Sequence, residues 1–259
     1  MQEVLKAVLV CLLAGAGAGI GTGFAGMSAA AVISPMLITF LDMPAYDAVG
    51  IALASDVLAS AASAWMYKKN KNIDVKNGII MMVCVLLFTM VGSYVASLVP
   101  NSTMGSFSVF MTMLLGIKFI LKPVNTTKEA MQAADPRKKL IGSVVCSCGV
   151  GFICGFIGAG GGMMMLLVLT TVLGYDLKTA VGTSVFIMSF TAFTGSVSHF
   201  ALGGMPDIMG LVLCIVFTLA WALIAAKIAN KASPKTLNRV TGVVLVIIGA
   251  VTVVFNYLV

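Results

Sequence analysis

The sequence predicts an all-helical membrane protein, a polytopic bundle of two inverted-topology repeats with five segments each. Three observations predict this fold: the apolar composition, the length of the apolar runs and an internal duplication. Hydrophobic residues make up 60% of the 259 residues and charged residues only 10%, and the mean hydropathy is +1.09. A soluble domain of this size needs a charged surface that this composition cannot supply. Runs such as 78–99 and 240–259 exceed the ~18 apolar residues that a membrane helix requires.

The duplication appears when the chain is aligned with itself at an offset of 132 residues, without a gap. The matched landmarks are Gly19, Gly23, Phe24 and Gly26 over Gly151, Gly155, Phe156 and Gly158, then residues 48–50 over residues 180–182, and Gly78 over Gly210. A duplicated apolar chain whose matched segments are broken by glycine is typical of transporters that bind a substrate between two halves.

Each half contains five apolar segments. They are residues 4–23, 27–41, 46–67, 78–99 and 103–121, then 140–157, 161–173, 178–200, 207–229 and 236–258. The second segment of each half has about 13–15 residues and spans only ~20 Å as a helix. We therefore expect these two to be half-helices that pair with the glycine-broken ends of the preceding segments. Residues 1–121 and 140–259 form the two repeats, and the polar stretch 122–139 is a cytoplasmic linker.

The basic residues predict the orientation in the membrane. If ten segments alternate in direction, fifteen of the sixteen Lys and Arg residues fall on one face, with only Lys6 outside. By the positive-inside rule this face is cytoplasmic and both termini are extracytoplasmic. Residues 68–76 are basic, whereas the homologous loop 200–207 has no Lys or Arg, as an inverted second copy requires. Basic residues in short loops between apolar runs also argue against a nucleic-acid partner.

The strongest local signal is a glycine run, Gly158-Ala159-Gly160-Gly161-Gly162. It favours an unwound turn, because each glycine costs ~1 kcal/mol of helix propensity relative to alanine. Backbone amides in such a turn, and the N-terminus of the following helix, attract anions. The matching turn of the first half, with Gly26 and Ser28, offers a hydroxyl. We expect both turns to meet near the bilayer midplane as an anion site; tight helix packing is the alternative.

Four further side chains are candidates for function. Thr183 and Ser184 could donate to an oxyanion, although intramembrane hydroxyls more often bond their own helix backbone. Asp56, whose counterpart is Met188, is the one acid well inside a membrane segment. Such carboxyls are costly and usually functional, so Asp56 is a candidate for proton coupling, with a structural hydrogen bond as the alternative. His199, the only histidine, is either a pH-sensitive gate or an interfacial residue.

Other function classes lack a signal. There is no nucleotide-binding, nucleophile or zinc motif, so we expect no enzyme activity, no cofactor and no metal. The six cysteines lie in predicted segments and do not suggest a disulfide framework; a thiol relay at residues 146–154 stays an alternative. Methionines 163–165 leave a soft-cation permease as a rival, and a passive anion channel or sensor is another. The expected partners are a small-anion substrate and the lipid bilayer, and a homodimer is left open.

The glycine run, the short apolar segment after it and Ala-Val-Gly-Thr-Ser at residues 180–184 resemble the sulfite exporter TauE/SafE family of membrane permeases. The first-half copy, from residues 23–26 through Pro35 to residues 48–50, is similar to that family's N-terminal repeat. The resemblance covers essentially the whole chain. It implies a plasma-membrane transporter of small sulfur-containing anions such as sulfite, sulfoacetate or other sulfonates. Residues 28–30 and 166–167 depart from the family pattern, which leaves the substrate open.

Overall fold

The computed structural model describes residues 2–96, 117–118, 120–132, 136–157, 161–203 and 206–257. These residues fold into helices. The helices are α1 (Gln2–Ala25), α2 (Ala30–Leu41), α3 (Ala45–Lys69), α4 (Val75–Ala96), α6 (Lys128–Gln132), α7 (Pro136–Ile157), α8 (Gly161–Leu167), the π-helix η1 (Val168–Val172), α9 (Leu177–Gly203), α10 (Ile208–Lys231) and α11 (Pro234–Tyr257). Within the described ranges, six helices are long and apolar enough to cross a membrane, which confirms a helical, multi-pass membrane protein.

The second segment of each half is short, as the sequence predicts. Helix α2 has 12 residues and spans ~18 Å at 1.5 Å per residue. Its counterpart is α8, which continues into η1, and together they cover Gly161–Val172. Neither is long enough to cross the hydrocarbon core alone. Both begin in the interior of the bundle, since Ala29 before α2 and Gly162 at the start of α8 are buried.

The glycines of the first segment do not break it, contrary to the sequence-based expectation. Helix α1 is continuous to Ala25, and Gly15, Gly19 and Gly23 lie on one face because they recur every four residues. A methyl group on Gly19 would lie 2.5 Å from the Thr218 carbonyl oxygen, and one on Gly23 would lie 2.5 Å from the Ala225 Cβ. The close approach of α10 therefore offsets the low helix propensity of these glycines.

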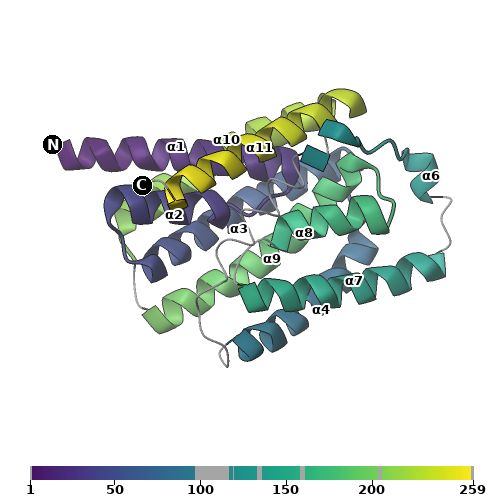
Figure 1. The fold of residues 1–259 in the computed structure, drawn as a ribbon, viewed down its shortest axis with the longest axis horizontal. Helices are drawn as coiled ribbons and strands as arrows, with labels where there is room; N and C mark the ends of the chain where they lie inside the picture. The colour runs from purple at the N-terminus through teal and green to yellow at the C-terminus, as the bar shows by residue number, and fades with distance from the viewer. Residues whose placement is uncertain are drawn as a thin grey trace.

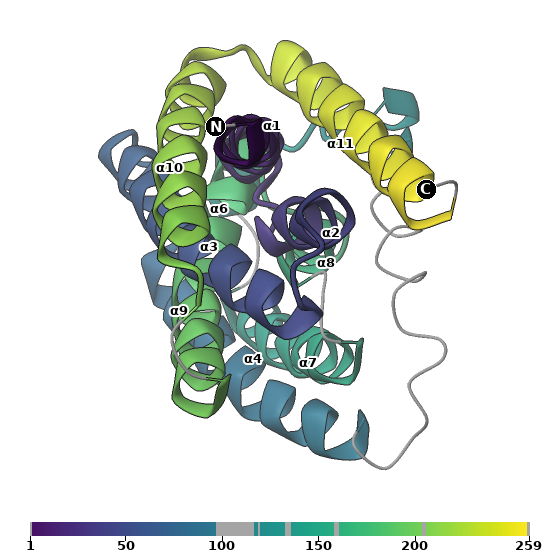
Figure 2. The same cartoon turned by 90° about the vertical axis from the view of Figure 1, so that its left-hand side faces the viewer.

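The helices pair across the two halves. The first helix of each half packs along the fourth helix of the other, so α1 lies against α10 and α7 against α4 (Figure 2). The third helices, α3 and α9, pack against each other. Their contacts run in opposite directions: Gly182 lies beside Tyr67, and Gly50 lies beside His199. The two third helices are therefore antiparallel.

The bundle has two distinct ends. The start of α1 and the end of α11 lie together at one end, which we call the terminal end, and α6 lies at the other, which we call the linker end (Figure 1). The linker is docked there and includes α6: Asn238 accepts from the Val124 amide at 2.7 Å and donates to its carbonyl at 2.9 Å. Helix α7 begins at Pro136, inside the predicted linker 122–139, because proline suits the first turn of a helix.

Candidate functional site

The first-half turn meets the start of α8 in the middle of the bundle. The Ser184 hydroxyl on α9 contacts both, with carbonyl oxygens accepting from it at Gly162 (3.0 Å) and Gly26 (3.3 Å). Gly26 has a positive φ of 61°, a conformation that glycine adopts without strain. A side chain on Gly162 would overlap the Gly26 carbonyl oxygen. The start of α8 and the turn before α2 are thus in direct contact.

Asp56 on α3 lies against the first of these turns. It is fully buried, and its Oδ2 accepts from the Ser28 hydroxyl at 2.7 Å. Its Oδ1 accepts from the Ser60 hydroxyl at 2.7 Å, and the Ala29 backbone also hydrogen-bonds the carboxyl group. A carboxylate is favoured at the N-terminus of α2, where the helix dipole is positive. Asp56 therefore occupies the donors that this turn offers to an anion.

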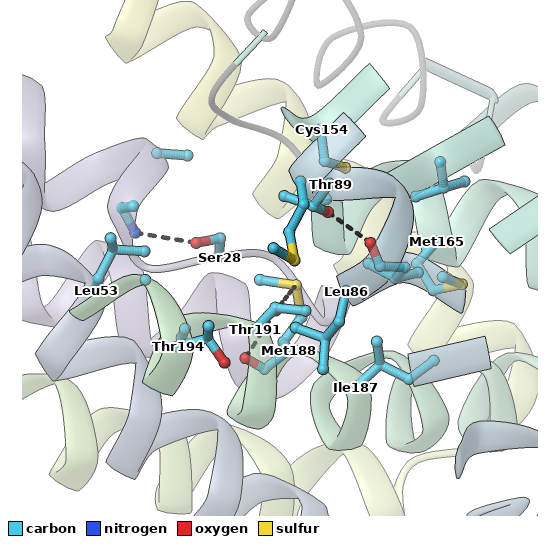
Figure 3. Close-up of a pocket in the computed structure, with 18 of the residues that line it drawn as sticks. Ser28, Leu53, Leu86, Thr89, Cys154, Met165, Ile187, Met188, Thr191 and Thr194 are labelled. Carbon is cyan, nitrogen blue, oxygen red and sulfur yellow. Dashed lines mark hydrogen bonds between the residues drawn. The ribbon is translucent and has the colours of Figure 1, made fainter. Parts of the chain in front are cut away.

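A cavity of about 440 Å³ opens next to the two turns. Ser28 and Gly161 are among its lining residues, and α4, α7 and α9 supply most of its walls (Figure 3). The polar groups on the walls are those of Thr89, Cys154, Thr191, Thr194 and His199. No Lys, Arg, Asp or Glu is among the described residues that line it. An anion in this cavity would interact with hydroxyls, thiol, imidazole and backbone dipoles.

The cavity extends from the turns toward the terminal end. Helices α4 and α9 both start at the linker end, and their first lining residues are Val85 and Ile187. The lining continues to Met90 on α4 and to His199 near the end of α9. The preceding ten residues of each helix do not line the cavity, so about 15 Å of packed helix separates it from the linker end.

The structure brings together most of the residues that the sequence singles out. Gly26, Gly162 and Ser184 are in contact, Ser28 and Gly161 open onto the cavity beside them, and Asp56 bonds Ser28. His199 lines the same cavity nearer the terminal end. Thr183 lies apart from this cluster, because its hydroxyl accepts from the Asp74 amide at 3.1 Å. Gly158 and Gly160 lie outside the described residues.

Sequence reasoning missed two polar contacts near the turns. Ser60 is four residues after Asp56, a spacing that places both on one helix face and could have identified it. Tyr67 lies near the end of an apolar segment, where an aromatic side chain is typically an interface anchor, but the structure places it in the interior. Tyr67 is fully buried, and its hydroxyl donates to the Gly23 carbonyl at 2.8 Å. It is held there by α9, since a methyl on Gly182 would lie 2.8 Å from the Tyr67 Cβ.

The bundle, with an internal cavity that no charged side chain lines among the described residues, is that of a multi-pass helical membrane protein. Comparison with known proteins extends this assignment. Residues 11–252 match the family described as Sulfite exporter TauE/SafE. The chain is 27% identical to the "Probable membrane transporter protein YunE" of Bacillus subtilis, over 89% of both chains. It is 26% identical to the "Probable membrane transporter protein MJ0441" of Methanocaldococcus jannaschii, over 89% of this chain and 87% of that one.

The chain belongs to the sulfite exporter TauE/SafE family, because the match covers nearly its whole length. The family and these relatives support a role in membrane transport. No solved structure matches the chain.

Proposed function

We propose that this protein is a secondary transporter of small sulfur-containing anions, of the sulfite or sulfonate type, across the plasma membrane. The family description supports the substrate class. The anion would bind where the first-half turn meets the start of α8, with Ser28 and the glycine backbone at residues 26 and 158–162 as its partners, and Ser184 would hold the two segments together. A passive anion channel, or a permease for another small organic anion, is the second candidate, since the uncharged cavity suits any of these.

The single observation that carries the proposal is that the first-half turn and the start of α8 meet beside a cavity. Ser28 and Gly161 both open onto this cavity and come from different halves of the chain. Sites at the junction of two repeats, formed by the ends of short helices, are a recurring design in secondary transporters. Binding through dipoles and hydroxyls, without a cationic side chain, favours modest affinity and ready release.

We infer that the two halves are inverted repeats that move relative to each other in alternating access. The helix pairings support this. In both α1 with α10 and α7 with α4, the first helix of one half packs against the fourth helix of the other half. The antiparallel contacts of α3 and α9 are also exchanged: residues 50 and 182 are homologous, and so are residues 67 and 199. A two-fold axis in the membrane plane would generate such pairs.

Asp56 would couple transport to protons by competing with the substrate. Its carboxylate takes the Ser28 hydroxyl and hydrogen-bonds Ala29, the same groups that an anion entering from the cavity would use. Protonation of Asp56 removes its charge and releases these donors, so that the anion binds together with a proton. The alternative is that Asp56 only caps α2; in that case an asparagine would replace it without a change in coupling.

We propose that the linker end faces the cytoplasm and that both termini are extracytoplasmic. Lys128, Lys178 and Lys235 gather at the linker end, where they line a second cavity of about 860 Å³. The positive-inside rule assigns such an end to the cytoplasm. The cavity next to the turns would then be open toward the extracytoplasmic side.

A ligand screen followed by a flux assay tests the proposed function. Purified protein is heated with sulfite, thiosulfate, sulfoacetate, taurine or carboxylates, and a ligand that binds only the folded state raises the melting temperature. We expect a sulfur-containing anion to give the largest shift and to show saturable flux in proteoliposomes. Flux that rises linearly with concentration would support a channel, and stabilisation by carboxylates alone would contradict the substrate class.

A further inference from the structure

The linker end is closed by a cluster of polar side chains from both halves. Asp74, just before α4, accepts at Oδ2 from the Tyr175 hydroxyl (2.9 Å) and from the Asn77 side-chain amide (2.8 Å). The Asp74 backbone amide donates to the Thr183 hydroxyl at 3.1 Å. Tyr175 and Thr183 are fully buried. These bonds tie the first turn of α4, in one half, to the start of α9, in the other.

The homologous positions at the terminal end have a different chemistry. At the offset of 132 residues, Met43 corresponds to Tyr175, Ile51 to Thr183 and Pro206 to Asp74. None of these three side chains carries a hydrogen-bond donor. The packing is nevertheless homologous: a methyl on Gly210 would lie 3.6 Å from the Met43 Cε and 3.7 Å from the Ile51 Cδ1, and 2.8 Å from the Asp207 carboxylate. That carboxylate accepts from the Gly210 amide of its own helix, α10, and among the described residues it makes no hydrogen bond to α2 or α3. At the linker end, a methyl on Gly78 would likewise lie 3.4 Å from the Thr183 Cγ2.

The two ends also differ in their relation to the cavity. The cavity lies between the turns and the terminal end, with its walls beginning at Val85 and Ile187. On the linker side of these residues the helices are packed, as shown by Met81, which is fully buried one turn before Val85. The polar cluster therefore lies at the closed end, and the apolar counterpart lies at the end toward which the cavity extends.

We propose that Asp74, Tyr175 and Thr183 form a latch that holds the linker end closed in this conformation and must break for the site to open to that side. This inference rests on the proposed alternating access. Burial, together with the neighbouring Asp74 carboxyl, raises the pKa of Tyr175, so its hydroxyl stays a donor throughout the physiological range. The latch acts at the linker end only. The homologous contact at the terminal end, made by Met43 and Ile51, has no hydrogen bonds to hold one geometry.

The test uses single-cysteine reporters in a variant whose six native cysteines are replaced. Thr191→Cys reports on the cavity, and Met81→Cys reports on the packed region between the cavity and the latch. Each is combined with Tyr175→Phe, which removes one hydroxyl and keeps the ring, or with Thr183→Val. Met43→Leu, at the position homologous to Tyr175, is the matched control. Sealed vesicles of known orientation are labelled with a membrane-impermeant thiol reagent from either side.

In the parent we expect the Thr191→Cys reporter to react from the terminal side only and the Met81→Cys reporter from neither side. Tyr175→Phe should raise labelling of Met81→Cys from the linker side by about threefold to tenfold, the shift expected from one lost hydrogen bond. It should lower labelling of Thr191→Cys from the terminal side, whereas Met43→Leu should do neither. A Met81→Cys reporter that stays unreactive in both latch variants, with the melting temperature showing folded protein, overturns the latch.

The outcomes separate the latch from the proposed function. Labelling needs no substrate, so a wrong assignment of the anion leaves the result unchanged. If the latch variants raise labelling of both reporters together, the latch closes the linker end but the two ends do not alternate, which contradicts the proposed transport mechanism. If Met81→Cys already reacts from the linker side in the parent, that end is open and the latch is wrong.

Discussion

The two turns at the site are homologous in sequence position but not in chemistry. The first-half turn carries Ser28, which bonds Asp56. In the second half, Gly160 corresponds to Ser28, and Met188 on α9 corresponds to Asp56. The Met188 sulfur would lie 3.3 Å from a methyl on Gly162. The first half thus pairs the Ser28 hydroxyl with a carboxylate that would compete with an anion for hydrogen-bond donors. The second half places Gly162 at the start of α8 beside a thioether. From this difference we infer that the first half couples transport to protons, whereas the glycines of the second half allow the backbone to approach the anion closely.

The largest effect should come from separating the two turns. Gly162→Ala places a methyl group on the Gly26 carbonyl oxygen, and relieving that overlap must move α8 away from the first-half turn. We expect flux to fall by more than about tenfold and stability to fall by about 1–3 kcal/mol. Proteoliposome flux and thermal unfolding measure the two effects.

Gly149→Ala on α7 is the matched control, because a methyl there has no neighbour within 4 Å. It should leave flux unchanged and stabilise the helix slightly, since alanine is the better helix former. Equal losses of flux in Gly162→Ala and Gly149→Ala would show that the contact between the turns has no special role.

A smaller effect should distinguish the two serines of the site. Ser28→Ala removes the hydroxyl that faces both Asp56 and the cavity, so we expect anion affinity to fall by about tenfold, near 1.4 kcal/mol. Ser184→Ala leaves two carbonyl oxygens without their shared donor and should lower stability by about 0.5–2 kcal/mol. Anion titrations and melting curves of both variants make the comparison. The opposite pattern, with Ser184 setting affinity and Ser28 only stability, would contradict the assigned roles.

The sequence predicts the helical class, the two short helices and the proximity of Gly26 to Gly162, because each depends on composition or on the duplication. Gly26 and Gly162 belong to homologous segments that meet beside Ser184. Aligning the sequence with itself reveals those segments. The partner of Thr183 was not predictable, since Asp74 lies in a loop whose place depends on α9. The glycines of α1 were misjudged as breaks because their spacing also suits close packing against α10, and only the structure decides between these readings.

The contrast between the two turns leads to one measurement on Asp56. Flux of a stabilising anion is followed in proteoliposomes under an imposed pH gradient, for the parent and for Asp56→Asn. Asparagine keeps an oxygen acceptor for one of the two serine hydroxyls and presents an amide donor to the other, whose oxygen can accept, but it carries no titratable proton. We predict that the parent accumulates anion in response to the gradient, and that Asp56→Asn still exchanges anion but loses this response. A variant that keeps full proton-driven uptake would contradict the role of Asp56 and leave it as a cap of α2.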